Sequence, residues 1–170
     1  SFRSELRTEN GFIWQSWDQA AQWCVQRNVN LEEALLWADS ASNNFGGDRS
    51  FQAWSTKAQI LQKMGKGAEA AEIMKKALPF GTMNEVHQYA RQLLGLKFTK
   101  MAFDVFKTNL DKYPNQFTTV MGMARAYSAL NDFTNALKFA NQALLLAPDE
   151  QNKTYVQGLI DKLKQKKDIN

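Results

Sequence analysis

The sequence is poor in the residues that support covalent or metal-based chemistry. Its 170 residues include one cysteine, Cys24, and one histidine, His87. A single cysteine excludes an internal disulfide framework and a cysteine-rich metal site. A single histidine excludes a multi-histidine metal site, and it leaves a serine–histidine triad with one base and no neighbouring residue to orient it. We therefore do not expect an enzyme, and we expect no metal and no cofactor.

Long apolar runs and a strong charge imbalance are missing as well. No run approaches the ~18 residues that a membrane-spanning helix requires. The net charge is only +4, weaker than the basic stripe of a typical nucleic-acid-binding protein. Lys and Arg number 4 against 7 Asp and Glu in residues 1–50, but 8 against 3 in residues 51–100. We expect neither a membrane span nor a nucleic-acid partner.

Strict apolar–polar alternation is nearly absent, and helical periodicity takes its place. Apolar residues recur at i, i+3, i+4 and i+7, which places them on one face of an α-helix. The pattern predicts nine helices, at residues 12–27, 31–44, 50–64, 67–78, 83–95, 98–112, 116–130, 133–146 and 150–167. Residues that close or interrupt helices stand at the breaks, among them Asn28, Gly65, Gly95, Asn131, Pro79 and Pro114. Such short connections make neighbouring helices antiparallel.

Four alanines divide this helical chain into repeats. Ala34, Ala70, Ala102 and Ala136 are spaced 36, 32 and 34 residues apart, each after a polar turn. A period of 20–50 residues is the signature of a solenoid, in which helix pairs stack to bury a shared core. Small residues at these positions let two helices approach closely. We therefore predict a stack of four helix pairs.

The pattern resembles the tetratricopeptide repeat, a helix pair of about 34 residues. The last repeat carries the best match, in Ala124, Tyr127, Ala136, Ala140, Ala143 and Pro148. The resemblance implies an all-α fold, a right-handed α-α superhelix with a C-terminal capping helix. It divides one solenoid domain into a leftover segment (1–11), a degenerate repeat (12–48), three further repeats (51–82, 83–116 and 117–150) and the cap (151–170).

The resemblance also implies a function and a surface. The chain would be a protein–protein or interdomain interaction scaffold that binds a peptide or a partner segment in a concave groove lined by the first helices. The implied groove residues are Trp23, Gln26, Gln59, His87, Arg91, Met121 and Arg125. Arginine presents a fork of donors that fits carboxylates, so Arg91 and Arg125 favour an acidic partner. The Lys and Asn clamp of some family members is absent, so their chaperone partners are not implied.

Tryptophan is concentrated near the start of the chain. Trp14, Trp17, Trp23 and Trp37 lie within the first 37 residues. Three of them span more than one helix face, so they cannot all face the second repeat. Two interpretations stay open: an interface formed by Trp14, Trp17 and Trp37, or a locally enlarged core.

The start of the chain supports a second, broader resemblance. Residue 1 is Ser rather than Met, and the chain resembles the helical part of a longer bacterial protein whose other half is a β-rich domain of unknown function. That resemblance implies an upstream domain as a partner and an exported location, with the cytoplasm as the alternative. Two other functions remain open: an RNA-binding helical-repeat module, and an auxiliary domain of an enzyme whose chemistry lies outside this chain.

Overall fold

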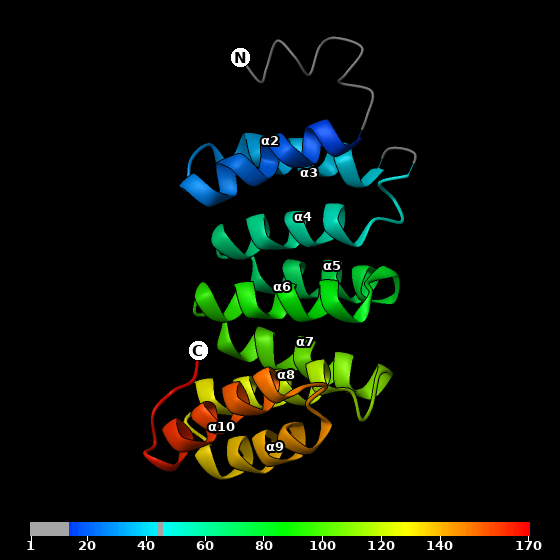
Figure 1. Cartoon of the computed structure of the whole chain (residues 1–170). Helices are drawn as coiled ribbons and strands as arrows, with labels where there is room; N and C mark the ends of the chain where they lie inside the picture. The colour runs from blue at the N-terminus through cyan, green and yellow to red at the C-terminus, as the bar shows by residue number, and fades with distance from the viewer. Residues whose placement is uncertain (1–13, 44–45) are drawn as a thin grey trace. The chain divides into compact units, whose positions relative to one another are not determined.

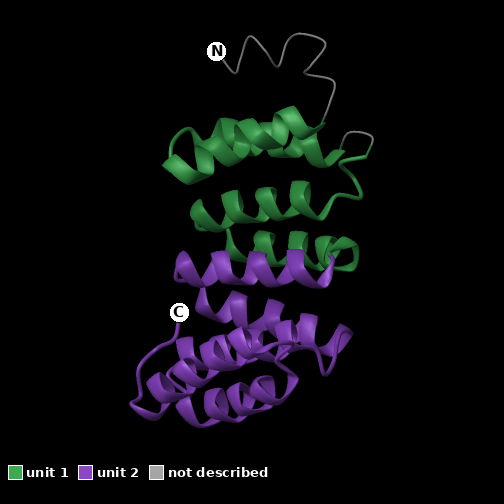
Figure 2. Cartoon of the chain, in the orientation of Figure 1, with its two compact units in different colours: residues 1–81 green, residues 82–170 purple. Residues whose placement is uncertain are grey.

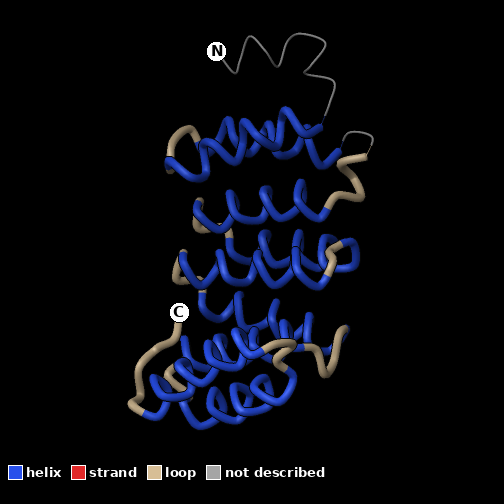
Figure 3. Tube along the Cα trace, in the orientation of Figure 1, coloured by secondary structure: helices blue, strands red, loops and turns tan. Residues whose placement is uncertain are grey.

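The computed structural model describes residues 14–43 and 46–170, and in these ranges all regular structure is helical (Figures 1 and 3). The predicted all-α fold is confirmed. The predicted leftover segment 1–11 lies outside the described residues. The elements in chain order are α2 (Trp14–Arg27), α3 (Leu31–Asn43), α4 (Phe51–Lys63), α5 (Gly67–Ala77), the 3-10 turn η2 (Leu78–Phe80), α6 (Met83–Gly95), α7 (Thr99–Lys112), α8 (Phe117–Ala129), α9 (Phe133–Leu146) and α10 (Glu150–Lys164).

The chain forms two compact units, Ser1–Gly81 (unit 1) and Thr82–Asn170 (unit 2), shown in Figure 2. In unit 1, α2 packs on α3 and α4 packs on α5, and α4 also contacts both helices of the first pair. In unit 2, α6 packs on α7 and α8 on α9, and α8 contacts both helices of the preceding pair. The last helix, α10, packs on α9.

The first helix of every pair ends in the same turn. Asn28, Gly65, Lys97 and Asn131 follow these helices with φ of 53°, 78°, 66° and 59°. After α8, the Asn131 amide donates to the Ser128 carbonyl (2.9 Å) and the Asp132 amide donates to the Tyr127 carbonyl (3.0 Å). This pair of reversed hydrogen bonds satisfies carbonyls that the helix leaves open. The pairs therefore share one turn geometry.

The third of these turns differs from the sequence-based prediction. The predicted range 83–95 ends at Gly95, which is the last residue of α6, but Lys97 rather than a glycine adopts the left-handed conformation. The Lys97 amide donates to the Leu94 carbonyl (3.0 Å), and the Phe98 amide donates to the Leu93 carbonyl (2.9 Å). The helix therefore ends where it was predicted to end, and a lysine takes the left-handed position of the turn.

Small residues control how closely the helices approach. The repeat alanines Ala34, Ala70, Ala102 and Ala136 are all 0% exposed. In α8, Gly122 faces an even tighter space, since a Cβ built there would lie 2.5 Å from Cδ1 of Phe106 and 3.4 Å from Nδ1 of His87. A Cβ at this position would require the Phe106 ring or α8 to shift.

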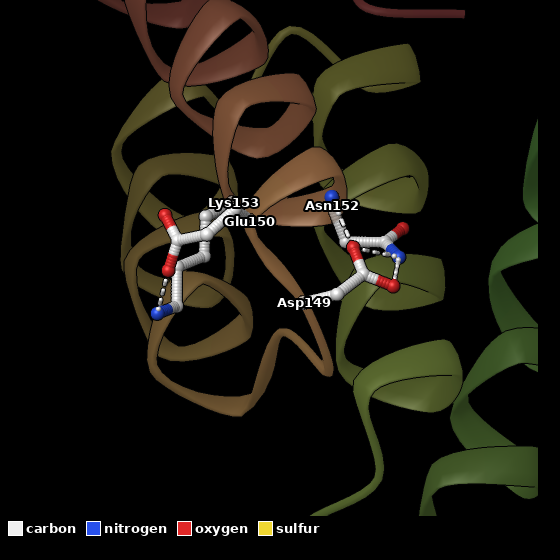
Figure 4. A network of polar contacts seen from close by, with 4 residues as sticks. All are labelled: Asp149, Glu150, Asn152 and Lys153. Atoms are coloured by element: carbon white, nitrogen blue, oxygen red, sulfur yellow. Dashed lines mark hydrogen bonds and ion pairs between the residues drawn. The ribbon is translucent and has the colours of Figure 1, made fainter.

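The start of α10 is fixed by side chains. Oδ1 of Asp149 accepts a hydrogen bond from the Asn152 amide at 2.8 Å, which satisfies one of the open donors at a helix start. Lys153 pairs with Glu150 across the first turn at 2.6 Å (Figure 4). On its buried side, α10 carries Val156, Leu159, Ile160 and Leu163.

Tryptophan and tyrosine divide between the units. All five tryptophans, Trp14, Trp17, Trp23, Trp37 and Trp54, belong to unit 1. All four tyrosines, Tyr89, Tyr113, Tyr127 and Tyr155, belong to unit 2. Each unit therefore contains its own intrinsic spectroscopic probe.

Candidate functional site

The face of α8 that was predicted to line an open groove is covered by the chain itself. Arg125 is only 6% exposed. Its Nη1 donates to the carbonyl of Ile169 at 3.0 Å, and its Nη2 donates to the hydroxyl of Tyr155 at 2.5 Å. Arg125 is therefore not an open groove residue, because residues that follow α9 in the chain occupy two of its donors.

The covering residues reach α8 through a turn after α10. Lys166 has φ of 54°, and the Lys167 amide donates to the Lys162 carbonyl at 3.0 Å, so α10 closes with the same turn as the first helices. Residues 167–170, here called the return segment, then continue without helical structure (red after α10 in Figure 1). The turn thus reverses the chain and brings the return segment onto α8.

The Ser128 hydroxyl binds the return segment both as a hydrogen-bond donor and as an acceptor. Its hydroxyl donates to Oδ1 of Asp168 at 2.6 Å and accepts from the Ile169 amide at 3.0 Å. The side-chain amide of Asn170 donates to the Arg125 carbonyl at 3.0 Å. Ile169 itself is 6% exposed and joins the core cluster that includes Val120. One turn of α8 therefore binds backbone and side-chain groups of three consecutive residues.

Electrostatics support this arrangement. Burial lowers the pKa of Arg125, while Tyr155 and Asp168 act in the opposite direction and favour its charged form. Burial alone would raise the pKa of Asp168, but hydrogen bonds from Ser128 and Asn170 outweigh it and leave that pKa lowered. The carboxylate of Asp168 in the return segment thus favours the charged form of the buried arginine.

His87 lies in the interior next to this site. It is 9% exposed, and its ring meets Phe106 edge to face at a centroid distance of 5.4 Å. Its Nδ1 has no hydrogen-bond partner among the described residues. Burial, with smaller contributions from Arg125 and Arg91, lowers the pKa of His87 to about 4. His87 is therefore neutral at neutral pH and is a core residue rather than a groove contact.

The other groove residues predicted in unit 2 divide between surface and interior. Met121 is buried in the same cluster as Ile169. Arg91 is exposed, and it lies close enough to influence the pKa values of both His87 and Arg125. Of the four predicted residues in this unit, Arg91 is the one that a partner can reach directly.

In unit 1 the predicted residues stay nearer the surface. Trp23 is 38% exposed, with the Arg27 guanidinium 4.5 Å from its ring centroid. Gln26 is exposed and Gln59 is half-buried. The predicted interface residues Trp14, Trp17 and Trp37 are each half-buried, and Trp37 packs against the core cluster of this unit.

The sequence did not indicate the buried acid of unit 1. Asp18 on α2 is 0% exposed, and its Oδ2 accepts hydrogen bonds from Gln22 (2.8 Å) and from Gln52 of α4 (2.6 Å). Burial raises its pKa, and nearby hydrogen-bonding side chains only partly oppose the rise. Asp18 was missed because an acidic residue early in an amphipathic helix normally faces solvent.

The return segment was missed as well. Asp168, Ile169 and Asn170 follow a lysine-rich stretch at the end of the predicted helix 150–167. The one signal was Ile169, an isolated aliphatic residue among polar neighbours. Tyr155 of α10 is 48% exposed, and its hydroxyl accepts a hydrogen bond from Arg125.

Two further kinds of site were searched for in the described ranges. No helix there is long and apolar enough to cross a membrane. No three His, Cys, Asp or Glu side chains in those ranges gather in a way that could hold a metal ion.

Comparison with known proteins agrees with the repeat pattern. Residues 51–78 and 119–150 match the family model described as tetratricopeptide repeat. Tetratricopeptide repeat protein 8 from Homo sapiens is 28% identical over 113 residues, which cover 64% of this chain and 20% of that protein. The Mus musculus protein of the same name gives the same identity and covers 21% of its length. The chain spans about a fifth of the length of these curated relatives.

Solved structures show the same fold at low sequence identity. YrrB, described as a TPR protein with an unusual peptide-binding site, aligns with a TM-score of 0.51 at 17% identity, over 98% of this chain and 84% of that one. A Podosopora anserina putative kinesin light chain with nearly identical TPR-like repeats aligns with a TM-score of 0.58 at 14% identity, over 94% and 89%. Residues 51–78 and 119–150 therefore carry tetratricopeptide repeats, and the structural neighbours share the helix-pair fold of the chain.

Proposed function

We propose that this chain is an interaction scaffold that binds an extended, acidic segment of a partner protein on the first-helix surface of unit 2. The family suggests a protein–protein interaction scaffold in general. The return segment supports the more specific proposal, because it is a non-helical stretch of chain already bound to α8. Arg125 and Ser128 bind both the carbonyl and the amide of Ile169, which is how a protein holds an extended peptide irrespective of its side chains.

Charge supports an acidic partner. Arg91 is exposed and makes no ion pair with any residue that the structure describes. The cation of Arg125 lies near enough to interact with it electrostatically. Two cations repel each other, so a carboxylate beside Arg91 would be favoured. An exposed ion pair contributes only ~0–1 kcal/mol, so most of the affinity would come from backbone hydrogen bonds and apolar contacts.

Predicted contacts in unit 1 belong to this proposal as secondary sites. Trp23 and Gln26 present an exposed aromatic ring and an exposed amide, and Gln59 offers a further amide on α4. A partner could be a separate protein or an upstream domain of the same chain. In either case, Arg91 is the residue whose removal tests the proposal most directly.

The experiment is a peptide selection followed by affinity measurements. Peptides selected from a random display library on the purified chain are expected to be acidic. Arg91→Ala is expected to weaken their binding by up to about fivefold, the size of an exposed ion pair, and to flatten its salt dependence. Lys138→Ala is the control, because it removes one exposed cation from α9. Neutral selected peptides, or a larger loss with Lys138→Ala, would refute the proposal.

A further inference from the structure

The return segment lies on α8 in the way a bound peptide would, and each of its last three residues is recognised differently. Asp168 is held through its carboxylate by the Ser128 hydroxyl (2.6 Å). Ile169 is held through its backbone and through a side chain that is 6% exposed in the core cluster. Asn170 donates its side-chain amide to the Arg125 carbonyl (3.0 Å) and to the Asp168 carboxylate (2.7 Å).

We infer that the α8 site is selective for the motif acidic residue–aliphatic residue–Asn, and that a partner carrying this motif binds by displacing residues 168–170. The inference rests on the proposed function and specifies its ligand. The partner is a protein with an exposed extended segment of that composition. The return segment is then an intramolecular ligand that keeps the site filled until the partner arrives.

The contacts explain why each motif position is restricted. The Ser128 hydroxyl donates its only proton to the Asp168 carboxylate and accepts from the next amide in the segment, so an acceptor is required at the first position. The second side chain enters an apolar cluster beside Leu159 and Leu163, which favours Ile, Leu or Val. The third side chain must donate to a helix carbonyl while also reaching back to the first carboxylate, and Asn has the length for both.

The return segment makes few buried contacts with α8, so a partner segment can displace it. One side chain of the segment, Ile169, is buried, whereas Asp168 and Asn170 remain exposed. The hydrogen-bonded turn after α10 keeps the segment beside α8, so its effective concentration is at least that given by a short flexible linker, on the order of mM. A free peptide with the same three contacts therefore competes poorly, whereas a partner with additional contacts on α6, including Arg91, can replace the segment.

The test uses the full chain and a labelled probe. The probe is a fluorescent, C-terminally amidated peptide with the sequence of residues 164–170, and its binding is followed by fluorescence anisotropy. Wild-type protein is expected to bind it weakly because its site is filled. Ile169→Ser, which weakens the return segment and leaves Arg125 and Ser128 in place, is expected to bind it at least about tenfold more tightly because the intramolecular competitor is lost.

Matched variants test the mechanism rather than the fold. Asp168→Ala keeps the apolar side chain of the segment and is expected to give a smaller gain than Ile169→Ser. Adding Ser128→Val to Ile169→Ser is expected to abolish probe binding, and so is replacing the isoleucine of the probe with serine. Hydrogen exchange of the α8 amides follows the same states, with protection lost in Ile169→Ser and restored by the probe.

Two results would overturn the inference. One is no gain in probe binding in either folded variant, as judged by far-UV circular dichroism. The other is equal binding of the serine-substituted probe. If selected acidic peptides still depend on Arg91 while the motif probe binds nowhere, the motif inference fails and the proposed function stands. If acidic peptides do not depend on Arg91 either, both fail.

Discussion

The two units bury opposite charges on their first helices, and they compensate them in different ways. In unit 1, Asp18 receives hydrogen bonds from the neutral side chains of Gln22 and Gln52, both within regular helices. In unit 2, Arg125 is satisfied by Tyr155 and by Ile169 of the return segment. The acid is enclosed by the fold itself, whereas the cation is enclosed by a segment attached through one turn. A buried charge can therefore mark a fixed core in one repeat and an exchangeable surface in another.

The units also differ in their expected response to pH. The folded-state pKa of Asp18 is raised by burial, so its contribution to stability is present at low pH and is lost as the pH rises through that raised value. The folded-state pKa of His87 is lowered to about 4, so its contribution is present above its unfolded value of about 6.5 and is lost as the pH falls through 4. Acid should favour unit 1 and disfavour unit 2.

The largest expected effect comes from removing the buried cation. Arg125→Ala should lower the free energy of unfolding of unit 2 by roughly 3–5 kcal/mol, since it deletes charge-assisted hydrogen bonds and leaves a cavity. Residue-resolved hydrogen exchange should show the loss in residues 82–170, while tryptophan emission, which arises from unit 1, should report a smaller change. Equal losses in both units would show that Arg125 is not specific to unit 2.

The second effect concerns acid. Between pH 7 and pH 4, His87 should cost unit 2 on the order of 3 kcal/mol, because each unit of pKa shift is worth about 1.4 kcal/mol. In His87→Leu, a variant of similar volume that cannot ionise, most of this loss should disappear, although Asp168 still titrates. The quantity to compare is the difference between the two pH profiles from hydrogen exchange of α6 and α8. Superimposable profiles would mean that His87 does not control the acid response.

The third effect compares one position in the two units. Gly122 is the sixth residue of α8 and Thr56 is the sixth residue of α4. Gly122→Ala should destabilise unit 2 by roughly 1–3 kcal/mol, because the new methyl group overlaps Phe106. Thr56→Ala should cost less, since it removes a buried hydroxyl and a methyl group but forces no side chain to move. Urea unfolding of each variant measures the two losses of stability. If Gly122→Ala is as stable as wild type, α8 packs less tightly against Phe106 than the structure shows.

The smallest expected effect concerns the buried acid of unit 1, Asp18. Asp18→Asn keeps an oxygen for Gln22 and Gln52 but cannot ionise. At pH 8 the variant should be more stable than wild type by up to ~1 kcal/mol, the size of a net hydrogen-bond contribution. At pH 4 the advantage should shrink, because the raised pKa of Asp18 favours its neutral form as the pH falls. Urea unfolding followed by tryptophan emission detects this, and an advantage that grows toward low pH would contradict the raised pKa.

The helices could be predicted from the sequence because the information is local. The predicted ranges 83–95 and 133–146 coincide with α6 and α9, since apolar periodicity and turn residues act over one or two helical turns. The cover of Arg125 could not be predicted in this way. Its partner Ile169 is 44 residues away, and no local pattern states where a segment goes after it leaves a helix.

The candidate site shows the same limit. The repeat register gave Arg91 and Arg125 the same first-helix position in consecutive repeats, and it treated both as open to a partner. Whether such a position is open depends on long-range packing, which differs between repeats. Arg91 is exposed one repeat earlier, although it has the same place in the pattern. Register thus predicts which residues share a face, and packing decides which of them are accessible.

The division of tyrosine and tryptophan between the units also allows the distance between them to be followed by intrinsic fluorescence. Excited tyrosine passes its energy to tryptophan through space, and the efficiency falls steeply with separation. Every tyrosine belongs to unit 2 and every tryptophan to unit 1, so each transfer event crosses from one unit to the other. The ratio of sensitised to direct tryptophan emission therefore follows the mutual arrangement of the units in solution without any added dye, including any change when a peptide replaces the return segment.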